Sequence, residues 1–256
     1  MTETRALELI TRIFLAWHTG QLGPGNTISK EKPKHLIVAI DGPAGAGKST
    51  IARAVAGRLN CVYIDTGAMY RAVALWALRA GIPVDDHLSL EHLAREARIE
   101  FEPGGNAVML NGEDVTLAIR EPEVTEAASK VSTIGGVRRA LQKEQRRIGQ
   151  AQAVVMEGRD IGTIVFPDAT VKVFLDAAPE VRAGRRARET GSQVEQTARE
   201  LSERDTRDRT RAEAPLTQAP DAEYMDTTHL PAEQVEEAIL KLIRKRTANG
   251  KSQHHS

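Results

Sequence analysis

A glycine-rich segment, IDGPAGAGKST, has the residue types and the spacing that bind phosphate groups. Its glycines let the backbone curl so that successive N–H groups point inward, and a helix that starts there adds its positive N-terminal end. Lys48 is expected to reach the β- and γ-phosphates of a nucleoside triphosphate, and the Ser49 hydroxyl is expected to contact Mg²⁺. An apolar run precedes this G-x-x-x-x-G-K-S pattern and a helical pattern follows it, so we predict a triphosphate-binding loop. Its residues are Gly42, Pro43, Ala44, Gly45, Ala46, Gly47, Lys48, Ser49 and Thr50.

Charged side chains also follow two further apolar runs. Arg71 belongs to DTGAMYR, and its guanidinium can form paired hydrogen bonds with a second phosphate. An ordinary surface arginine explains that position equally well. Arg159 and Asp160 belong to GRDIGT and cannot both be buried without partners. For this second pair a binding role is therefore the favoured interpretation.

Two segments nearer the C-terminus are dense in charge. PEVRAGRRARE sets arginines over the expected phosphate site, where they would neutralise a transferring phosphoryl group, or it forms an ordinary basic surface helix. ERDTRDRTR places Arg204, Asp208 and Arg211 at i, i+4 and i+7 of an expected helix, on one narrow stripe. We expect Asp208 to hold both arginines of that stripe in an acceptor pocket. Asp205 and Arg209 are expected to form a solvated pair on nearly the opposite side.

The elements that position these groups are predicted from five apolar runs, each expected to be a strand. They are HLIVAI (35–40), CVYID (61–65), AVVMEG (153–158), VKVFLD (171–176) and EYMD (223–226). Helical patterns separate most of them, which predicts βαβ units and a mostly parallel sheet flanked by helices. Ligands of such sheets bind beyond the carboxyl ends of the strands. The acidic residues at this edge are Asp41, Asp65, Glu157 and Asp176.

An insertion between the second and third runs has a different character. RIEFE, PGGN and AVML-NG-EDV predict three short antiparallel strands at about 99–115. Asn111-Gly112 is a strong hairpin signal, because a type I′ turn needs positive φ at both central residues. We expect this module to lie on a mobile subdomain that runs from about 66 to about 130.

The bulk composition argues against several classes of protein. Lys plus Arg and Asp plus Glu number 35 each in 256 residues, so the chain as a whole has no electrostatic bias towards nucleic acid or an anionic membrane. No apolar run approaches the ~20 residues that a membrane span needs. The single cysteine, Cys61, fits a reducing compartment. We expect a cytoplasmic monomer that acts on small molecules, without nucleic-acid or membrane partners.

Four segments together point to a family. IDGPAGAGKST, DTGAMYRA, GRDIGTIVFPDA and ERDTRDRTRAEAPL resemble bacterial cytidylate kinase, in order from about residue 35 to about 245. The first segment alone is unspecific, but the later three are distinctive. The resemblance implies the P-loop nucleoside monophosphate kinase fold, with a five-stranded parallel sheet and a small antiparallel β insertion. It also implies ATP and Mg²⁺ as cofactors, and a direct in-line phosphoryl transfer that converts CMP and dCMP to CDP and dCDP.

The resemblance assigns roles to single residues, and base chemistry agrees with two of them. Cytosine presents an amino donor at N4, so a carboxylate such as Asp160 can accept from it, and a guanidinium such as Arg138 can donate to O2 and N3. The residues expected to bind CMP are Thr66, Tyr70, Arg71, Ser129, Arg138, Arg159, Asp160, Arg204, Asp208 and Arg211. Within this set, Arg71 and Arg159 match arginines that grip the phosphate, and Ser129 matches a further residue that reads the base. The residues expected to act in catalysis are Lys48, Arg159, Arg185 and Arg186, with Ser49 as the metal ligand.

The sequence patterns set the expected domain boundaries, and the resemblance adds the division into core, acceptor-binding insertion and lid. The boundaries are 1–34 for an N-terminal extension and linker, 35–247 for the kinase domain and 248–256 for a frayed C-terminus. Inside the kinase domain the core takes 35–65 and 131–247, the acceptor-binding insertion about 66–130, and a short lid about 182–195.

Two other functions remain open at this point. One is a related kinase for another small acceptor such as UMP. The other is a GTPase-like switch or an ATP-driven nucleic-acid module. The chain contains no N-K-x-D guanine-reading sequence, and its balanced charge without basic residues interleaved with aromatics argues against the module.

Overall fold

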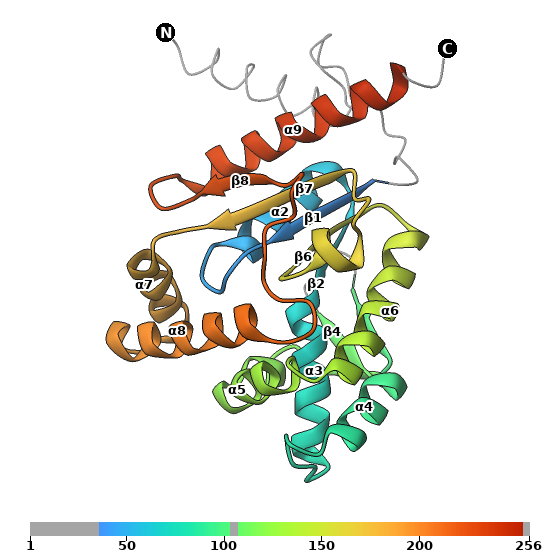
Figure 1. Ribbon diagram of the computed structural model, residues 1–256, viewed down its shortest axis with the longest axis vertical. Coiled ribbons are helices and arrows are strands. Elements are labelled where there is room, and N and C mark those ends of the chain that lie inside the picture. The colour runs from blue at the N-terminus through green and yellow to red at the C-terminus, as the bar shows by residue number, and fades with distance from the viewer. Residues whose placement is uncertain (1–35, 103–106, 253–256) are drawn as a thin grey trace, which may run out of the picture. The chain divides into compact units, whose positions relative to one another are not determined.

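A parallel sheet forms the centre of the described chain (Figure 1). The computed structural model describes residues 36–102 and 107–252, so the extension predicted at 1–34 and the PGGN turn at 103–106 lie outside the described residues. The strands are β1 (Ile37–Asp41), β2 (Val62–Asp65), β6 (Val154–Gly158), β7 (Val171–Asp176) and β8 (Glu223–Asp226). Their order is β2-β6-β1-β7-β8 with parallel pairing throughout. The predicted α/β class and the five strands are confirmed.

The two faces of the sheet are covered by different elements, because successive side chains of a strand point to opposite faces. Val38 and Ile40 lie in the core formed with helices α2 (Lys48–Leu59) and α9 (Ala232–Ser252). Ala39, between them, packs on the other face against a π-helical turn, η2 (Ile161–Val165). Helix α6 (Gly135–Ala151) packs behind that turn. The strand that leads into the glycine-rich loop is therefore buried on both sides.

A second core lies beside the sheet and contains the insertion. Its helices are α3 (Thr66–Arg79), α4 (His87–Glu96), η1 (Ala118–Arg120) and α5 (Pro122–Val131), together with the first half of α6. The predicted antiparallel module is confirmed as β3 (Ile99–Phe101), β4 (Val108–Leu110) and β5 (Glu113–Asp114). Asn111 and Gly112 have φ of 52° and 87°, as the predicted type I′ turn requires. Helix α4 was not among the predicted elements.

Helices α7 (Pro179–Thr190) and α8 (Val194–Thr210) pack against each other beside the carboxyl ends of the strands (Figure 1). Gly191 ends α7 in the left-handed conformation, with φ of 69°. Arg211 already has extended backbone, so α8 ends one residue before it. These two helices carry the charge-dense segments of the sequence to the edge of the sheet where ligands bind.

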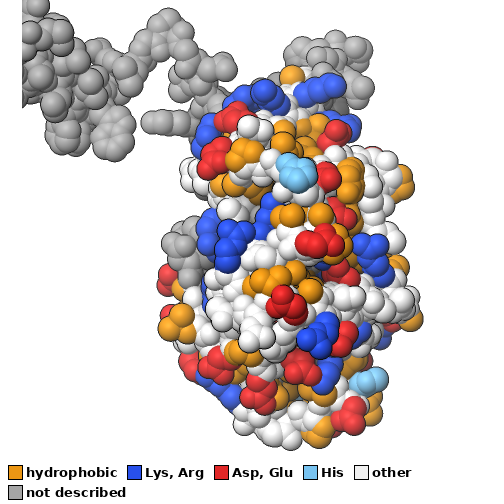
Figure 2. All heavy atoms as spheres, turned by 90° about the vertical axis from the view of Figure 1, so that its left-hand side faces the viewer, with side chains coloured by type: hydrophobic (Ala, Val, Ile, Leu, Met, Phe, Trp, Pro, Cys, Tyr) orange, Lys and Arg blue, Asp and Glu red, His pale blue; other side chains and the backbone are white. Residues whose placement is uncertain are grey.

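The surface that Figure 2 presents mixes acidic and basic side chains, with no area of a single sign dominating it. This agrees with the equal numbers of acidic and basic residues in the sequence. Within 36–102 and 107–252, we find no helix that combines the length and the apolar character needed to cross a bilayer.

Candidate active site

The glycine-rich loop between β1 and α2 depends on its glycines for close packing. Gly42, Gly45 and Gly47 all have positive φ, at 146°, 77° and 89°. A Cβ added to Gly42 would lie 1.9 Å from the carbonyl oxygen of Leu175, so no other residue fits there. The predicted loop residues are thus held in a curled backbone that ends at the N-terminus of α2, which is the geometry that cradles phosphate groups.

Lys48 lies in this loop with its Nζ donating a 2.7 Å hydrogen bond to the Pro43 carbonyl. Burial lowers its pKa to about 7, and the positive charges of Arg159 and Arg204 act in the same direction against the smaller opposite effect of Glu157 and Asp41. A triphosphate placed in the loop would add negative charge beside the ammonium group and favour its charged form. The charges around Lys48 therefore favour the binding of an anion in this loop.

Ser49 and Glu157 form the group that fits a magnesium ion. The exposed Ser49 hydroxyl is near enough to the Glu157 carboxylate to lower its pKa, and that carboxylate accepts a 2.5 Å hydrogen bond from Tyr63. Burial and the nearby charge of Asp65 raise the pKa of Glu157. Over the described ranges no cluster of three His, Cys, Asp or Glu side chains could hold a metal by itself. Mg²⁺ commonly takes only one or two protein oxygens and completes its shell with phosphates and water, so the residues present fit it.

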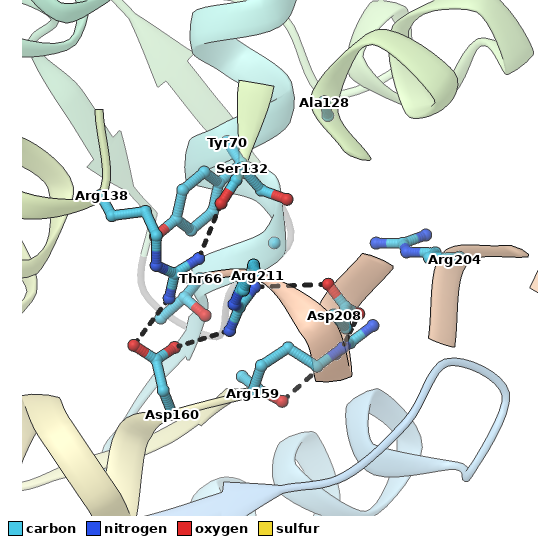
Figure 3. Close-up of a pocket in the computed structure, with 12 residues that line it drawn as sticks. Thr66, Tyr70, Ala128, Ser132, Arg138, Arg159, Asp160, Arg204, Asp208 and Arg211 are labelled. Carbon is cyan, nitrogen blue, oxygen red and sulfur yellow. Dashed lines mark hydrogen bonds and ion pairs between the residues drawn. The ribbon is translucent and has the colours of Figure 1, made fainter. Parts of the chain in front are cut away.

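A cavity opens between the sheet edge, α3, α5 and α8 (Figure 3). The structure brings most of the predicted acceptor residues to its lining, namely Thr66, Tyr70, Arg138, Arg159, Asp160, Arg204, Asp208 and Arg211. Gly67, Ala128, Ser132 and Gly158 also line it and were not predicted. Arg71 and Ser129 are not part of this lining. Arg71 instead pairs with Asp65 at 2.8 Å, and the buried Ser129 hydroxyl has no hydrogen-bond partner among the described residues.

An alternating chain of charges forms one wall of the cavity (Figure 3). Arg138 donates to Asp160 at 2.7 Å, and Arg211 lies 3.8 Å from the other oxygen of the same carboxylate. Arg211 then reaches Asp208 at 3.3 Å, and Arg159 donates to Asp208 at 2.9 Å. Burial disfavours the charged form of Asp208, but its three arginine neighbours outweigh burial and hold its pKa below the ordinary value. Buried charges are tolerated here because each acid lies between cations.

Arg204 is the exception to this pairing. Among the residues that the structure describes, it forms no hydrogen bond and no ion pair, and burial together with Arg159 lowers its pKa to about 10. The prediction that Asp208 holds both Arg204 and Arg211 is therefore wrong for Arg204. The carboxylate oxygen that would have bound Arg204 is taken by Arg159, which reaches it from the end of β6. An unpaired guanidinium in a cavity is a ready binding group for an anion.

The solvated Asp205–Arg209 pair predicted for the far side of α8 is also wrong. Asp205 is buried and accepts a 2.6 Å hydrogen bond from Arg182 of α7. Arg182 donates further to the carbonyl oxygens of Ala44 and Ala177, at 3.2 and 3.0 Å. The reason is that α7 covers this side of α8, so the face opposite Asp208 is a helix–helix interface. Arg182 thereby connects the glycine-rich loop to both helices.

The two arginines predicted for catalysis on α7 differ in their surroundings. Arg185 donates to the hydroxyl and carbonyl oxygens of Thr227 at 3.0 and 2.6 Å. Its Nη1 also lies 3.8 Å from the position a Cβ of Gly47 would take, at the mouth of the glycine-rich loop. Arg186 is partly exposed and pairs with Glu189 on its own helix. Both lie on the helix beside the loop, and only Arg185 is tied to the core.

Gln142 is a polar residue that the sequence reasoning missed. It is buried in α6 and donates a 2.9 Å hydrogen bond to Asp160. The signal available in the sequence was its position four residues after Arg138, which places both side chains on one face of a helix.

The family model and the sequence relatives agree with each other. A family model described as cytidylate kinase matches residues 38–245. A cytidylate kinase of Solibacter usitatus is 58% identical over 227 residues, covering 86% of this chain and 97% of that protein. A cytidylate kinase of Citrifermentans bemidjiense is 46% identical over 230 residues, covering 87% and 99%. A solved shikimate kinase of Acinetobacter baumannii is 18% identical with a TM-score of 0.43, covering 82% of this chain and 93% of that one.

Proposed function

The chain belongs to the cytidylate kinase family, and from that premise we propose how its own residues phosphorylate CMP with ATP. The reaction is a phosphoryl transfer between two nucleotides. A bond forms between an oxygen of the CMP phosphate and the γ-phosphorus of ATP, and the bond from that phosphorus to the β–γ bridging oxygen breaks. ADP leaves with that oxygen, and CMP becomes CDP.

The glycine-rich loop would hold the donor. Its inward N–H groups and the start of α2 bind the phosphates, and Lys48 reaches the β- and γ-phosphates. Ser49 with Glu157 would hold Mg²⁺, which screens the charge of the phosphates when it is bound. Arg185, fixed by Thr227 at the mouth of the loop, and Arg186 beside it would stabilise charge on the transferring group. The chain needs no residue to act as a strong base for such a transfer.

The cavity would hold the acceptor, and the single observation that carries this assignment is the unpaired Arg204 beside the charge chain. Arg71 and Arg159 grip the CMP phosphate, and Arg204 adds a cation that forms no ion pair with a carboxylate of the described residues. Asp208 and Arg211 contact the ribose and neighbouring groups. Asp160 and Arg138 read the cytosine, with Ser129 offering its buried hydroxyl. Thr66 and Tyr70 complete the lining.

We propose that dCMP is also an acceptor and that the insertion at about 66–130 and the lid at about 182–195 close over the substrates to exclude water. We also propose that the protein acts as a monomer on small-molecule substrates. The balanced charge supports small-molecule work without nucleic-acid or membrane partners, and the single cysteine fits the reducing cytoplasm.

A coupled ADP-release assay with ATP, Mg²⁺ and each nucleoside monophosphate in turn tests this function. We expect CMP and dCMP to be used far better than UMP, AMP or GMP. A higher kcat/KM for UMP than for CMP would contradict the assigned acceptor. Nucleotide binding without turnover that depends on a monophosphate would contradict the kinase assignment as a whole.

A further inference from the structure

The buried polar face of α6 contains a contact that the proposed reaction leaves unexplained. Gln142 is 7% exposed, does not line the cavity, and donates from Nε2 to the Oδ2 atom of Asp160 at 2.9 Å. Arg138, one turn earlier on the same helix face, donates to the same oxygen at 2.7 Å. Two donors therefore converge on one carboxylate oxygen, which has two lone pairs to offer.

The other oxygen of Asp160 is left for a ligand. Oδ1 lies 3.8 Å from Nη2 of Arg211, and that nitrogen is buried without a hydrogen-bond partner. Both residues line the cavity (Figure 3). The two oxygens of Asp160 therefore differ. Oδ2, on the side of α6, accepts two hydrogen bonds, whereas Oδ1, on the side of the cavity, can still accept one. A ligand that donates to Oδ1 completes the pattern.

The backbone that follows Asp160 is held by contacts from β1 and α6. The turn η2 starts directly after it, and the Asp41 carboxylate accepts from the Ile161 and Gly162 N–H groups at 2.9 and 2.7 Å. Arg146 of α6 donates to the carbonyl oxygens of η2 at Ile164 and Val165. Main chain and side chain of Asp160 are thus fixed by separate sets of bonds. Of the two donors to the Asp160 side chain on α6, Gln142 is the uncharged one.

The difference between cytosine and uracil suggests a role for the hydrogen bond from Gln142 to Asp160. Cytosine has an amino group at C4 that donates to a carboxylate, whereas uracil has a carbonyl oxygen there. A carboxylate locked in place accepts from the first and repels the second, while one free to turn away would discriminate less. On the basis of these contacts we propose that Gln142 is a positioning residue that sets the preference for cytosine over uracil by locking the Asp160 carboxylate. This inference rests on the proposed reading of cytosine by Asp160.

A neighbour on the same helix offers a matched control. Gln145 is 1% exposed and lies three residues further along the same buried face, and it makes no hydrogen bond with Asp160. Replacing either glutamine by methionine removes an amide of similar length from the interior of α6. Only the change at Gln142 removes a donor from Asp160, so a general loss of packing and a loss of positioning can be separated.

The test measures kcat/KM for CMP and for UMP in the full-length protein with saturating ATP and Mg²⁺. For Gln142→Met we expect the CMP-to-UMP ratio to fall about tenfold, mainly through a higher KM for CMP, because a charged hydrogen bond of this kind is lost. Gln142→Glu should lower the ratio further, since its carboxylate repels Asp160. Gln142→Asn keeps an amide donor and should fall between Met and the parent. Gln145→Met should leave the ratio unchanged.

The Asp160→Asn variant separates the two possible failures. If that change leaves the CMP-to-UMP ratio intact, the proposed reading of cytosine by Asp160 is wrong, and the inference for Gln142 goes with it. If Asp160→Asn lowers the ratio and Gln142→Met does not, only the positioning role is wrong. Equal losses of kcat/KM for both pyrimidines in Gln142→Met, with a lower melting temperature, would reduce Gln142 to a structural residue. In the Asp160→Asn background, Gln142→Met should change the ratio no further.

Discussion

The donor loop and the acceptor cavity are built on opposite principles. The loop is shaped by backbone: three glycines with positive φ, one of them in contact with the Leu175 carbonyl, and one lysine bonded within the loop itself. The cavity is shaped by side chains, and those of α6, α8 and the segment after β6 hold one another through ion pairs. A change in the loop is therefore expected to act on catalysis alone, whereas a change in the ion pairs of the cavity acts on binding and stability together.

The largest effect is expected in the loop. Lys48→Ala should lower kcat about a thousandfold, because a preorganised cation aimed at the transferring phosphoryl group is lost. Thermal unfolding should change little, since Lys48 bonds only within the loop. Steady-state ADP release measures the first quantity and calorimetry the second. The exposed Lys143→Ala is the matched control. An unchanged kcat would remove Lys48 from the donor site.

In the cavity, Asp208→Ala should affect both quantities. It leaves the half-buried Arg159 and the buried Arg211 without their shared acid, so we expect kcat/KM for CMP to fall about a hundredfold and the free energy of unfolding to fall by about 3 kcal/mol. ATP binding, measured by titration calorimetry, should survive. A loss of activity with unchanged stability would mean that the ion pairs do not support the fold as we infer.

Arg204→Ala tests the cavity at a charged residue that, within the described residues, forms no ion pair. We expect kcat/KM for CMP to fall about thirtyfold from the loss of a charged contact with the acceptor phosphate. Stability should be unchanged or higher, because a half-buried cation without an ion pair is removed. Denaturant unfolding measures the change in stability, and steady-state kinetics measure the change in kcat/KM for CMP. A clear loss of stability would show that Arg204 is paired in solution.

The smallest effect on activity is expected at Asp205. Asp205→Asn weakens the bond to Arg182 and should lower the free energy of unfolding by about 2 kcal/mol, while kcat/KM for CMP falls only a few-fold. Arg209→Ala, on the exposed side of α8, should change neither. An activity loss equal to that of Asp208→Ala would contradict the division of α8 into a ligand face and a packing face.

The same contrast explains what the sequence could predict. Local signals fixed the strands, the Asn111-Gly112 turn and the loop, because each depends on residues adjacent in the chain. The ion-pair partners within the cavity were harder to predict. The spacing on α8 puts Arg204 near Asp208, but it does not show that Arg159, which follows β6, forms the ion pair with Asp208 instead. Asp205 was misassigned for a related reason, because the helix that buries it lies elsewhere in the sequence.

Arg182 has a consequence for protein engineering. From α7, this one side chain contacts the glycine-rich loop at Ala44, the residue after β7 at Ala177 and the middle of α8 at Asp205. A chimera that takes α7 from one relative and α8 from another could separate Arg182 from its matching partner at position 205. The two helices should therefore be exchanged as one block, and substitutions at 182 and 205 should accumulate together as sequences diverge.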